Sequence, residues 1–511
     1  MRFMAKISPA RKAAFQILMA VERGQPHSDD LLRGKAVSAL SAPDRNLATA
    51  LVLGVLRWQI QLDHQCQALL TRPNAKLDPE IRIALRLGAF QLLHMDRIPA
   101  RAAIDESVEL AQQAGHRFAS GMVNAVLRKM ARYEQTLDSL SAPIEDFALK
   151  GHDFTGVPID RSSSMGWEFS RAENAANSAG PLALGGIRSE ESTQDLALAQ
   201  AHPTWMVERW ISFYGLDAAR AICRYGQCQP ALTLRLAGPA AEADLAAAGI
   251  SLEPGELLTA ARIVVSGDVT PTEAFREGHI RLQDEGSQLV AELAGYSDES
   301  GNNPNQKEKR IIDACAAPGG KTLILAERNP HARIVACESS PSRLEQLRKR
   351  LAAHDARIEC RLADSTALTE NSVYDLALAD VPCSGTGTLG RNPEIRHRLR
   401  PEDLTGQAER QRAILTAALR AVRPGGHVVY STCSLEQEEN EQVVAAVLAA
   451  NSGARLVSLE TRIGQLLDEN ILTSAGAERL RGSLTREGFL RLLPGTFHTD
   501  GFFICIIERT S

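Results

Sequence analysis

The chain has 511 residues, of which 44% are hydrophobic and 23% are charged, and this composition excludes a largely disordered protein. Its length predicts about three folded units, and the lack of any run of about 18 apolar residues excludes a membrane-spanning helix. The formal net charge of −5 excludes a uniformly basic nucleic-acid-binding protein, although a whole-chain sum can hide a local excess of positive charge.

Residues 1–134 are predicted to form an all-helical unit. Apolar residues recur three and four positions apart in segments such as ARKAAFQILMAVERG, which is the pattern of amphipathic helices. Ser41 and Pro79 are expected helix starts. Up to Arg132 the chain carries 19 Lys and Arg against 11 Asp and Glu, a net charge of +8. This excess favours a polyanionic partner such as RNA, and solvated helix faces would explain the same count equally well.

The rest of the chain divides into three segments. Residues 135–202 are rich in Ser, Gly, Ala and Asn without a sustained period, which predicts a mobile linker or insertion. Residues 203–290 mix helix with short alternating strands and predict a small α+β domain. In residues 291–511, short apolar runs alternate with helical stretches, so we expect an α/β domain with a mostly parallel sheet and helices on both faces. Its expected strands are RIIDACA, RIVACES, IECRLAD, YDLALADVP, GHVVYSTC and GFFICIIER, and the segment SDESGNNPNQKEK before them is an expected surface loop.

Nine cysteines are spread along the chain without the close pairing of a zinc site. We therefore expect a reduced, cytoplasmic protein that holds no metal. The first residues, MRFMAKISPARKAAF, lack the hydrophobic core of a secretory signal peptide, and no membrane or obligate protein partner is expected.

The strongest local motif is DACAAPGGKT, residues 313–322, which lies between the apolar strand RII and the helix LILAER. Small residues and paired glycines let a ligand approach the backbone closely, and the helix that follows offers unpaired amide groups. This indicates a nucleotide-type site at the edge of an open sheet. A Walker A phosphate loop is the competing interpretation, and it fails because Cys315 stands where that pattern needs glycine.

Acidic residues end the next two predicted strands. Glu338 lies about 20 residues after the glycines, where a carboxylate can accept both hydroxyls of a ribose, and Asp364 could accept the amino group of an adenine. Each could instead be a charge that caps the following helix. Three successive strand ends with ligand-type residues favour an adenosyl ligand.

Cysteines follow the fourth and fifth strands, in DVPCSGTGT at Cys383 and in STCS at Cys433. In a doubly wound sheet both turns lie at the edge that carries the glycine loop. A thiolate that adds to carbon 6 of cytosine makes carbon 5 nucleophilic enough to accept a methyl group. A single cysteine is more often a small buried hydrophobe, but the pair favours this chemistry. Enzymes that methylate exocyclic amino groups use an Asp/Asn-Pro-Pro-aromatic turn where this chain has Pro-Cys, so carbon is the favoured acceptor.

These motifs, together with the terminal LRLLPGTFHTDGFFICII, resemble the RNA 5-methylcytosine methyltransferase family over residues 203–509. The resemblance implies a Rossmann-like class I methyltransferase fold and an S-adenosyl-L-methionine donor. It makes Cys433 the nucleophile and Cys383 the residue that assists proton removal and release of the covalent adduct. The residues that it implies as cofactor contacts are Cys315, Ala316, Ala317, Pro318, Gly319, Gly320, Lys321, Glu338, Asp364 and Asp380.

The helical unit resembles the RNA-binding fold of NusB, through PARKAAFQIL, APDRNLATALVLGVLRW and GMVNAVLRKM. The two resemblances together imply a branch of the family that methylates a cytidine in 16S rRNA. Lys321 and Asp380 are expected to orient the cofactor and the base. RNA phosphates could contact Arg391, Arg396, Arg398 and Arg400, or these arginines could simply be solvated. Two alternatives stay open, a tRNA target and an RNA-binding module without catalytic activity.

Overall fold

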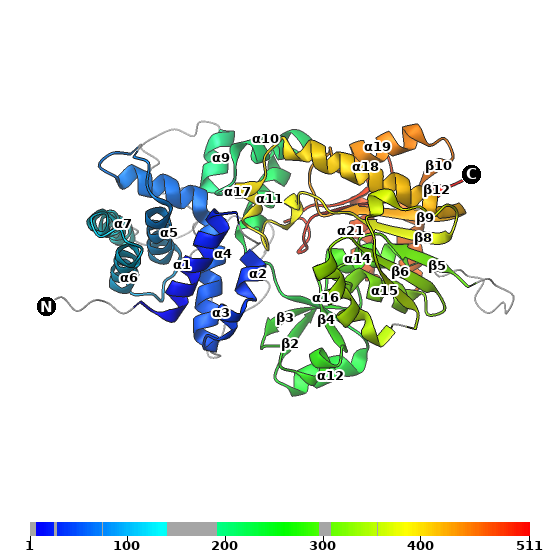
Figure 1. The fold of residues 1–511 in the computed structure, drawn as a ribbon, viewed down its shortest axis with the longest axis horizontal. Coiled ribbons are helices and arrows are strands. Elements are labelled where there is room, and N and C mark those ends of the chain that lie inside the picture. Colours follow the sequence, from blue (N-terminus) through cyan, green and yellow to red (C-terminus); the bar gives the residue numbers. More distant parts are fainter. Residues whose placement is uncertain (1–6, 25–27, 74, 141–191, 296–307, 355) are drawn as a thin grey trace. The chain divides into compact units, whose positions relative to one another are not determined.

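The computed structural model describes residues 7–24, 28–73, 75–140, 192–295, 308–354 and 356–511 (Figure 1). The chain forms two compact units, Met1–Cys228 with Gly390–His397, and Gln229–Leu389 with Arg398–Ser511. Most of the expected linker at 135–202 and of the loop SDESGNNPNQKEK lies outside the described residues. No helix within the described ranges is both long and apolar enough to cross a membrane.

The first unit is helical throughout its described part, as the apolar periodicity predicts (Figure 1). Both predicted helix starts are present. The hydroxyl of Ser41 accepts a hydrogen bond from the amide of Asp44 at the start of the long fourth helix, and Pro79 occupies a first-turn position where its missing amide has no cost. The helices of this part are α1 (Pro9–Glu22), α2 (Ser28–Leu32), α3 (Lys35–Ser38), α4 (Ala42–Leu69), α5 (Pro79–His94), α6 (Ala100–Gln113) and α7 (Ser120–Leu140).

Three further helices belong to the same unit, although we expected residues from 203 onward to join the α+β domain. They are α9 (Thr193–Ala199), α10 (Thr204–Tyr214) and α11 (Leu216–Gln227). The difference arises from tertiary packing, because Ala201 lies in the core of the helical unit and Trp210 is fully buried. Residues 390–397, which include most of the short helix α17 (Ile395–Arg398), also pack in this unit.

A small antiparallel sheet opens the second unit, with the strand order β2-β3-β1-β4. Its elements are β1 (Thr233–Leu236), α12 (Pro239–Ala247), β2 (Ser251–Pro254), β3 (Ala261–Ser266), α13 (Glu273–Arg276) and β4 (Ile280–Leu282). Leu234, Leu245 and Ile280 form its apolar cluster with residues of both helices. Helix α14 (Glu285–Ala294) follows and begins at Asp284, whose carboxylate accepts the amides of Gly286 and Ser287.

The large sheet has eight strands, seven of them in the order β10-β12-β9-β8-β5-β6-β7, with β11 paired to β12. Four pairings at the centre of the sheet are parallel: β5 with β6, β5 with β8, β6 with β7, and β8 with β9. The pairing of β9 with β12 is antiparallel. All six predicted strands are present. The elements are β5 (Arg310–Asp313), α15 (Gly320–Arg328), β6 (Arg333–Glu338), α16 (Pro341–Leu351), β7 (Ile358–Leu362), β8 (Tyr374–Asp380), α18 (Asp403–Ala421), β9 (Val422–Thr432), α19 (Glu441–Ala450), β10 (Ala454–Val457), α20 (Leu459–Asp468), α21 (Ser474–Gly482), β11 (Leu490–Leu492) and β12 (Phe502–Arg509).

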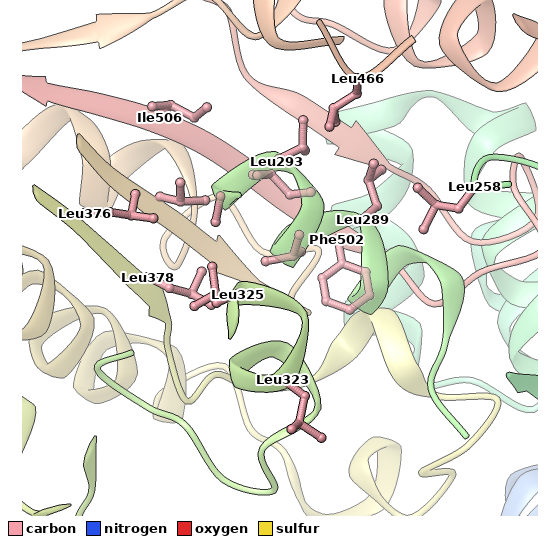
Figure 2. Packing of buried hydrophobic residues seen from close by; sticks show 14 of the residues in the cluster. Leu258, Leu289, Leu293, Leu323, Leu325, Leu376, Leu378, Leu466, Phe502 and Ile506 are labelled. Atoms are coloured by element: carbon pink, nitrogen blue, oxygen red, sulfur yellow. The ribbon is translucent and has the colours of Figure 1, made fainter. Parts of the chain in front are cut away.

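Helices cover both faces of this sheet, as expected for a Rossmann-like fold. Successive strand residues point to opposite faces, so Ile504 and Ile506 pack with α14, α15 and α20 (Figure 2), whereas Cys505 and Ile507 pack with α18 and α19. The two-sided burial explains why these strands read as continuous apolar runs.

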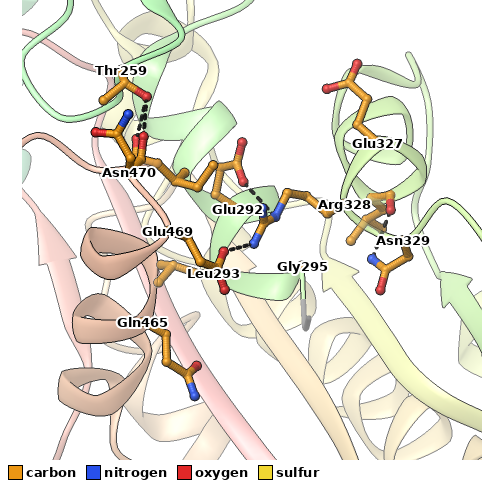
Figure 3. Close-up of polar contacts among 12 residues, drawn as sticks. Thr259, Glu292, Leu293, Gly295, Glu327, Arg328, Asn329, Gln465, Glu469 and Asn470 are labelled. Carbon is orange, nitrogen blue, oxygen red and sulfur yellow. Dashed lines mark hydrogen bonds and ion pairs between the residues drawn. The ribbon is translucent and has the colours of Figure 1, made fainter. Parts of the chain in front are cut away.

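A buried ion network joins the small sheet to the helices below the large one. The carboxylate of Glu292 on α14 is fully buried and pairs with Arg235 of β1 at 2.7 Å and with Arg328 of α15 at 3.3 Å. Arg328 also pairs with Glu469 after α20 (Figure 3). Because one carboxylate contacts guanidinium groups from two subdomains, it fixes the small sheet against the methyltransferase-type core.

Candidate active site

The glycine loop connects β5 to α15, and a buried carboxylate fixes its two ends. Asp313, at the end of β5, accepts hydrogen bonds from the Thr322 hydroxyl at 2.7 Å and from the Cys315 amide at 3.4 Å. Burial raises the pKa of Asp313 to about 6, against the hydrogen bond from Thr322, which favours the charged form. Our sequence analysis did not single out this residue. Its only signal was an acidic side chain at a strand end, directly before a loop of small residues.

The paired glycines leave the loop backbone open to a ligand. Gly319 has φ of 100°, in the left-handed region, and a Cβ atom there would lie 2.9 Å from Leu347. A Cβ atom on Gly320 would lie 3.0 Å from the side-chain oxygen of Gln283. A side chain is therefore strained at Gly319 and crowded at Gly320, and glycine at both positions leaves the backbone accessible to a ligand.

The other expected contacts of the loop differ in exposure. Cys315 is half-buried, and burial raises the pKa of its thiol well above the usual value. Ala316 is buried and packs in the apolar cluster beneath the sheet. Ala317 is half-buried and Pro318 is exposed. The rim of the loop is thus formed by backbone and small side chains rather than by charged groups.

Glu338 ends β6, next to β5 in the parallel sheet, so it lies beside the glycine loop. It is 4% exposed and accepts a hydrogen bond of 2.8 Å from the amide of Ser340. Its other oxygen lies 3.5 Å from the guanidinium group of Arg343 on the following helix. Glu338 is therefore not an exposed charge, although it does bond to the start of that helix. Asp364, two residues past the end of β7, is exposed and accepts hydrogen bonds from the Thr366 amide and hydroxyl, which lower its pKa. The capping interpretation holds for one oxygen of Asp364.

The two cysteine turns meet at the carboxyl edge of the sheet. Strands β8 and β9 are parallel neighbours with Asp380 opposite Ser431, and each is followed by a cysteine-bearing turn. The sulfur atoms of Cys383 and Cys433 lie 3.3 Å apart. The hydrogen bond with Cys433 and burial raise the pKa of Cys383 well above its usual value. Cys383 therefore remains a thiol under conditions where an ordinary exposed cysteine begins to ionise.

Lys321 and Asp380 form an ion pair beside these turns. The Nζ atom of Lys321 lies 2.8 Å from one oxygen of Asp380, and the other oxygen accepts a hydrogen bond of 2.7 Å from Ser431. Burial lowers the pKa of Lys321, but attraction to Asp380 outweighs it and leaves the pKa above its usual value, with a further contribution from Cys433. A charged ammonium group thus lies within electrostatic reach of Cys433.

The four arginines after the Cys383 turn do not form one surface. Arg396 is 2% exposed and donates hydrogen bonds to the backbone oxygens of Arg57 and Ala201, so the hypothesis that it holds RNA phosphates is wrong. Arg391 and Arg398 are half-buried, and Arg400 is exposed.

A different arginine lies closer to the site. Arg410 on α18 is exposed, and its charge acts on both Cys315 and Asp364. Sequence reasoning missed it because a helical arginine has no distinguishing motif.

Two parts of the chain match families of known proteins. Residues 302–508 match the family described as 16S rRNA methyltransferase RsmB/F, and residues 8–132 match the NusB family. A protein of Bacillus subtilis named "Probable ribosomal RNA small subunit methyltransferase B" is 32% identical over 99% of both chains. The ribosomal RNA small subunit methyltransferase B of Pseudomonas putida is 29% identical, over 89% of this chain and 92% of its own.

Two solved structures share the fold. That of PH0851 covers 99% of this chain and all of its own, with a TM-score of 0.70 at 20% identity. The structure of NSun6 from Pyrococcus horikoshii with SFG covers 61% of this chain and 99% of its own, with a TM-score of 0.51 at 18% identity.

Proposed function

The chain belongs to the RsmB/F family of 16S rRNA methyltransferases, and we propose that it methylates carbon 5 of a cytidine in 16S rRNA through a covalent cysteine adduct. As a member of this family it is an S-adenosylmethionine-dependent rRNA methyltransferase. The acceptor atom and the adduct go beyond that membership. The observation that carries them is the 3.3 Å separation of the sulfur atoms of Cys383 and Cys433.

The two sulfur atoms fit two different chemical tasks. Cytosine carbon 5 is too weakly nucleophilic to take a methyl group unaided. The thiolate of Cys433 forms a bond to carbon 6, and the electron pair of the 5,6 double bond moves toward carbon 5. Lys321 lies within electrostatic reach of Cys433, whereas Cys383 holds its proton more tightly than an ordinary cysteine, so we assign the role of nucleophile to Cys433.

Cys383 serves the second half of the reaction. After transfer, carbon 5 carries both a proton and the new methyl group. Removal of that proton restores the 5,6 double bond, and the bond between carbon 6 and the Cys433 sulfur breaks with the electron pair returning to sulfur. Once the sulfur of Cys433 is bonded to carbon 6, the contact that holds the proton on Cys383 is lost and Cys383 can ionise. Its thiolate then accepts the proton of carbon 5, becomes a thiol again, and so assists the release of product.

The residues around the glycine loop fit an adenosyl donor. Its ribose would be held by the buried Glu338 and its adenine by Asp364. Its amino-acid part would be held by the loop from Cys315 to Lys321, where Gly319 has a left-handed φ that disfavours any side chain. When bound, the donor supplies the methyl group from its sulfonium. Asp380, held by Lys321 and Ser431, is placed to accept the amino group of the target base.

We place the reaction in the cytoplasm, where nine free thiols stay reduced. The test incubates the protein with tritiated S-adenosylmethionine and either 16S rRNA or tRNA, followed by bisulfite mapping of 5-methylcytosine. Label at carbon 5 of a cytidine in 16S rRNA is the expected result. Label in tRNA alone would show that tRNA, and not 16S rRNA, is the substrate. Tight RNA binding without any label would show that the protein is an RNA-binding module without catalytic activity.

A further inference from the structure

One buried carboxylate lies behind both cysteine turns and has no part in the reaction described above. Glu439 sits between β9 and α19 and is completely buried. One of its oxygens accepts hydrogen bonds from the Ser384 amide at 2.8 Å and from the Gln411 side-chain amide at 2.9 Å. The other accepts from the hydroxyls of Ser384 and Ser434. All four donors are neutral, so hydrogen bonds alone compensate this buried charge.

The donors are the immediate neighbours of the two cysteines in the chain. Ser384 follows Cys383, and Ser434 follows Cys433. The side-chain amide of Gln411, on α18, donates as well to the backbone oxygen of Pro382, at 2.9 Å. A single carboxylate therefore holds the residue after each cysteine, and through Gln411 also the residue before Cys383.

The turns have few other direct links. The amide of Gly387 donates to the backbone oxygen of Cys433 at 2.9 Å, and the hydroxyl of Thr386 accepts the amide of Leu435 at 2.9 Å. Beside the sulfur atoms, the hydroxyls of Ser384 and Ser434 also lie 3.1 Å apart, and both donate to the same oxygen of Glu439. The bonds to Glu439 hold the residues directly beside the sulfur atoms, where a shift changes the distance between them most.

We propose that Glu439 is a positioning residue of the methyl transfer, which ties the two cysteine turns together and keeps their sulfur atoms at reacting distance. The proposal rests on the function proposed above. The charge of Glu439 has a second effect of the same sense. After the contact with Cys433 and burial, it raises the pKa of Cys383 further, so it makes the Cys383 thiolate a stronger base for the proton of carbon 5.

Two substitutions separate the hydrogen bonds that hold the two turns together from the negative charge of Glu439. Glu439→Gln can keep the geometry, because its oxygen can accept from the Ser384 amide and Gln411 while its NH2 group donates to the two hydroxyls, which are free to rotate. Glu439→Ala removes both effects. The matched control is Glu438→Gln, the same change at a half-buried neighbouring position.

The first readout is kinetic. We expect kcat of Glu439→Ala to fall about 10²-fold, the effect of a misplacement near 1 Å in a catalytic site, while KM for S-adenosylmethionine stays within about twofold, since Glu439 is not a donor contact. Glu439→Gln should recover most of this loss, and Glu438→Gln should behave as the parent. Near-parental kcat in Glu439→Ala, or a loss confined to KM, would overturn the proposal.

The second readout needs no RNA and uses Glu439→Gln, the variant that can keep the geometry of the turns. In a Cys433→Ser background, the rate of Cys383 alkylation by iodoacetamide is measured by mass spectrometry across pH. Glu439→Gln should shift the midpoint to lower pH, and an unchanged midpoint would contradict the charge effect. Trapping of the parent protein on 5-fluorocytidine RNA tests the proposed function separately. If the parent forms no adduct, that function fails whatever the alkylation result.

Discussion

The guanidinium group of Arg396 donates a hydrogen bond of 3.0 Å to the backbone oxygen of Arg57, 339 residues earlier in the chain. Arg396 also donates to the backbone oxygens of Ala201 and Gly226, and Arg57 donates in turn to that of Gly390. The segment that follows the Cys383 turn along the chain is thereby built into the core of the helical unit.

Replacement of Arg396 by alanine should therefore destabilise the helical unit. The change removes three hydrogen bonds that a charged guanidinium group donates, and the buried carbonyl groups that accepted them lose this donor. We therefore expect the free energy of unfolding to fall by about 3 kcal/mol or more. Urea denaturation measures it, with the exposed Arg400→Ala as control. If Arg396→Ala kept its stability but bound RNA more weakly, Arg396 would contact RNA phosphates after all.

The same segment should make the helical unit sensitive to acid. The Nε2 atom of His397 donates to the backbone oxygen of Leu56 at 2.7 Å, and burial lowers the pKa of His397 to about 3. Its unfolded value is about 6.5. As pH falls from about 6.5 toward 3, only the unfolded chain binds this proton, so stability drops by up to about 1.4 kcal/mol per pH unit. Burial of His202 acts in the same direction.

The measurement compares melting temperatures at pH 7.5 and 5.5 for the parent and for His397→Gln, whose side-chain amide can replace the donor. The variant should lose less stability between the two values. Identical pH dependence would mean that His397 does not contribute to the acid response.

Local patterns predicted most of the fold and the placement of the site. Strand residues such as Ile504 and Cys505 are buried on opposite faces, so their apolar run identified a central strand without tertiary information. The caps at Ser41 and Pro79 also depend on neighbours within one turn. Because β8 and β9 are parallel, knowing where each strand ends was sufficient to bring Cys383 and Cys433 to one edge.

Features that depend on distant contacts could not be predicted in this way. Arg396 lies among three other arginines within ten residues, and only backbone oxygens from remote helices distinguish it from a solvated charge. Helices α10 and α11 were recognised as helices, but periodicity does not say which core they join. Glu439 lies in an acidic run of sequence, which predicts an exposed segment. It is buried because the turns that carry Ser384 and Ser434, 50 residues apart in the chain, meet beside it.

The ion network of Glu292 should contribute strongly to the stability of the second unit. Glu292→Gln keeps the volume of the side chain but removes the one fully buried carboxylate that Arg235 and Arg328 share, and leaves each with a more exposed partner, Glu327 or Glu469. This predicts a loss of about 3 kcal/mol, the lower end of the range for a broken buried ion pair. Glu327→Gln is a suitable control because that carboxylate, which also contacts Arg235, is 35% exposed. Equal effects of the two substitutions in thermal unfolding would contradict the importance of burial.

Gly387 should be intolerant of any side chain. A Cβ atom there would lie 2.6 Å from the backbone oxygen of Gly501 and 2.9 Å from that of Cys433, and both are main-chain atoms that cannot rotate away. We expect Gly387→Ala to displace the Cys433 turn and lower kcat about 10²-fold, with little change in KM for S-adenosylmethionine. Gly406→Ala, which meets no atom within 4 Å, is the control. Parental kcat in Gly387→Ala would show that the turns can separate without harm.

The two cysteines should be distinguished by what each variant accumulates on RNA. Without Cys433 no bond to carbon 6 can form, so Cys433→Ala should give neither methylation nor a covalent complex. Without Cys383 the first bond still forms, but proton removal and release slow down, so Cys383→Ala should accumulate a protein–RNA adduct that survives denaturing electrophoresis. The sulfur atoms are only 3.3 Å apart, so geometry alone does not separate the two roles, and the adduct that each variant accumulates is what assigns them. An adduct in Cys433→Ala and none in Cys383→Ala would reverse the assignment, and adducts in neither variant would argue against covalent catalysis.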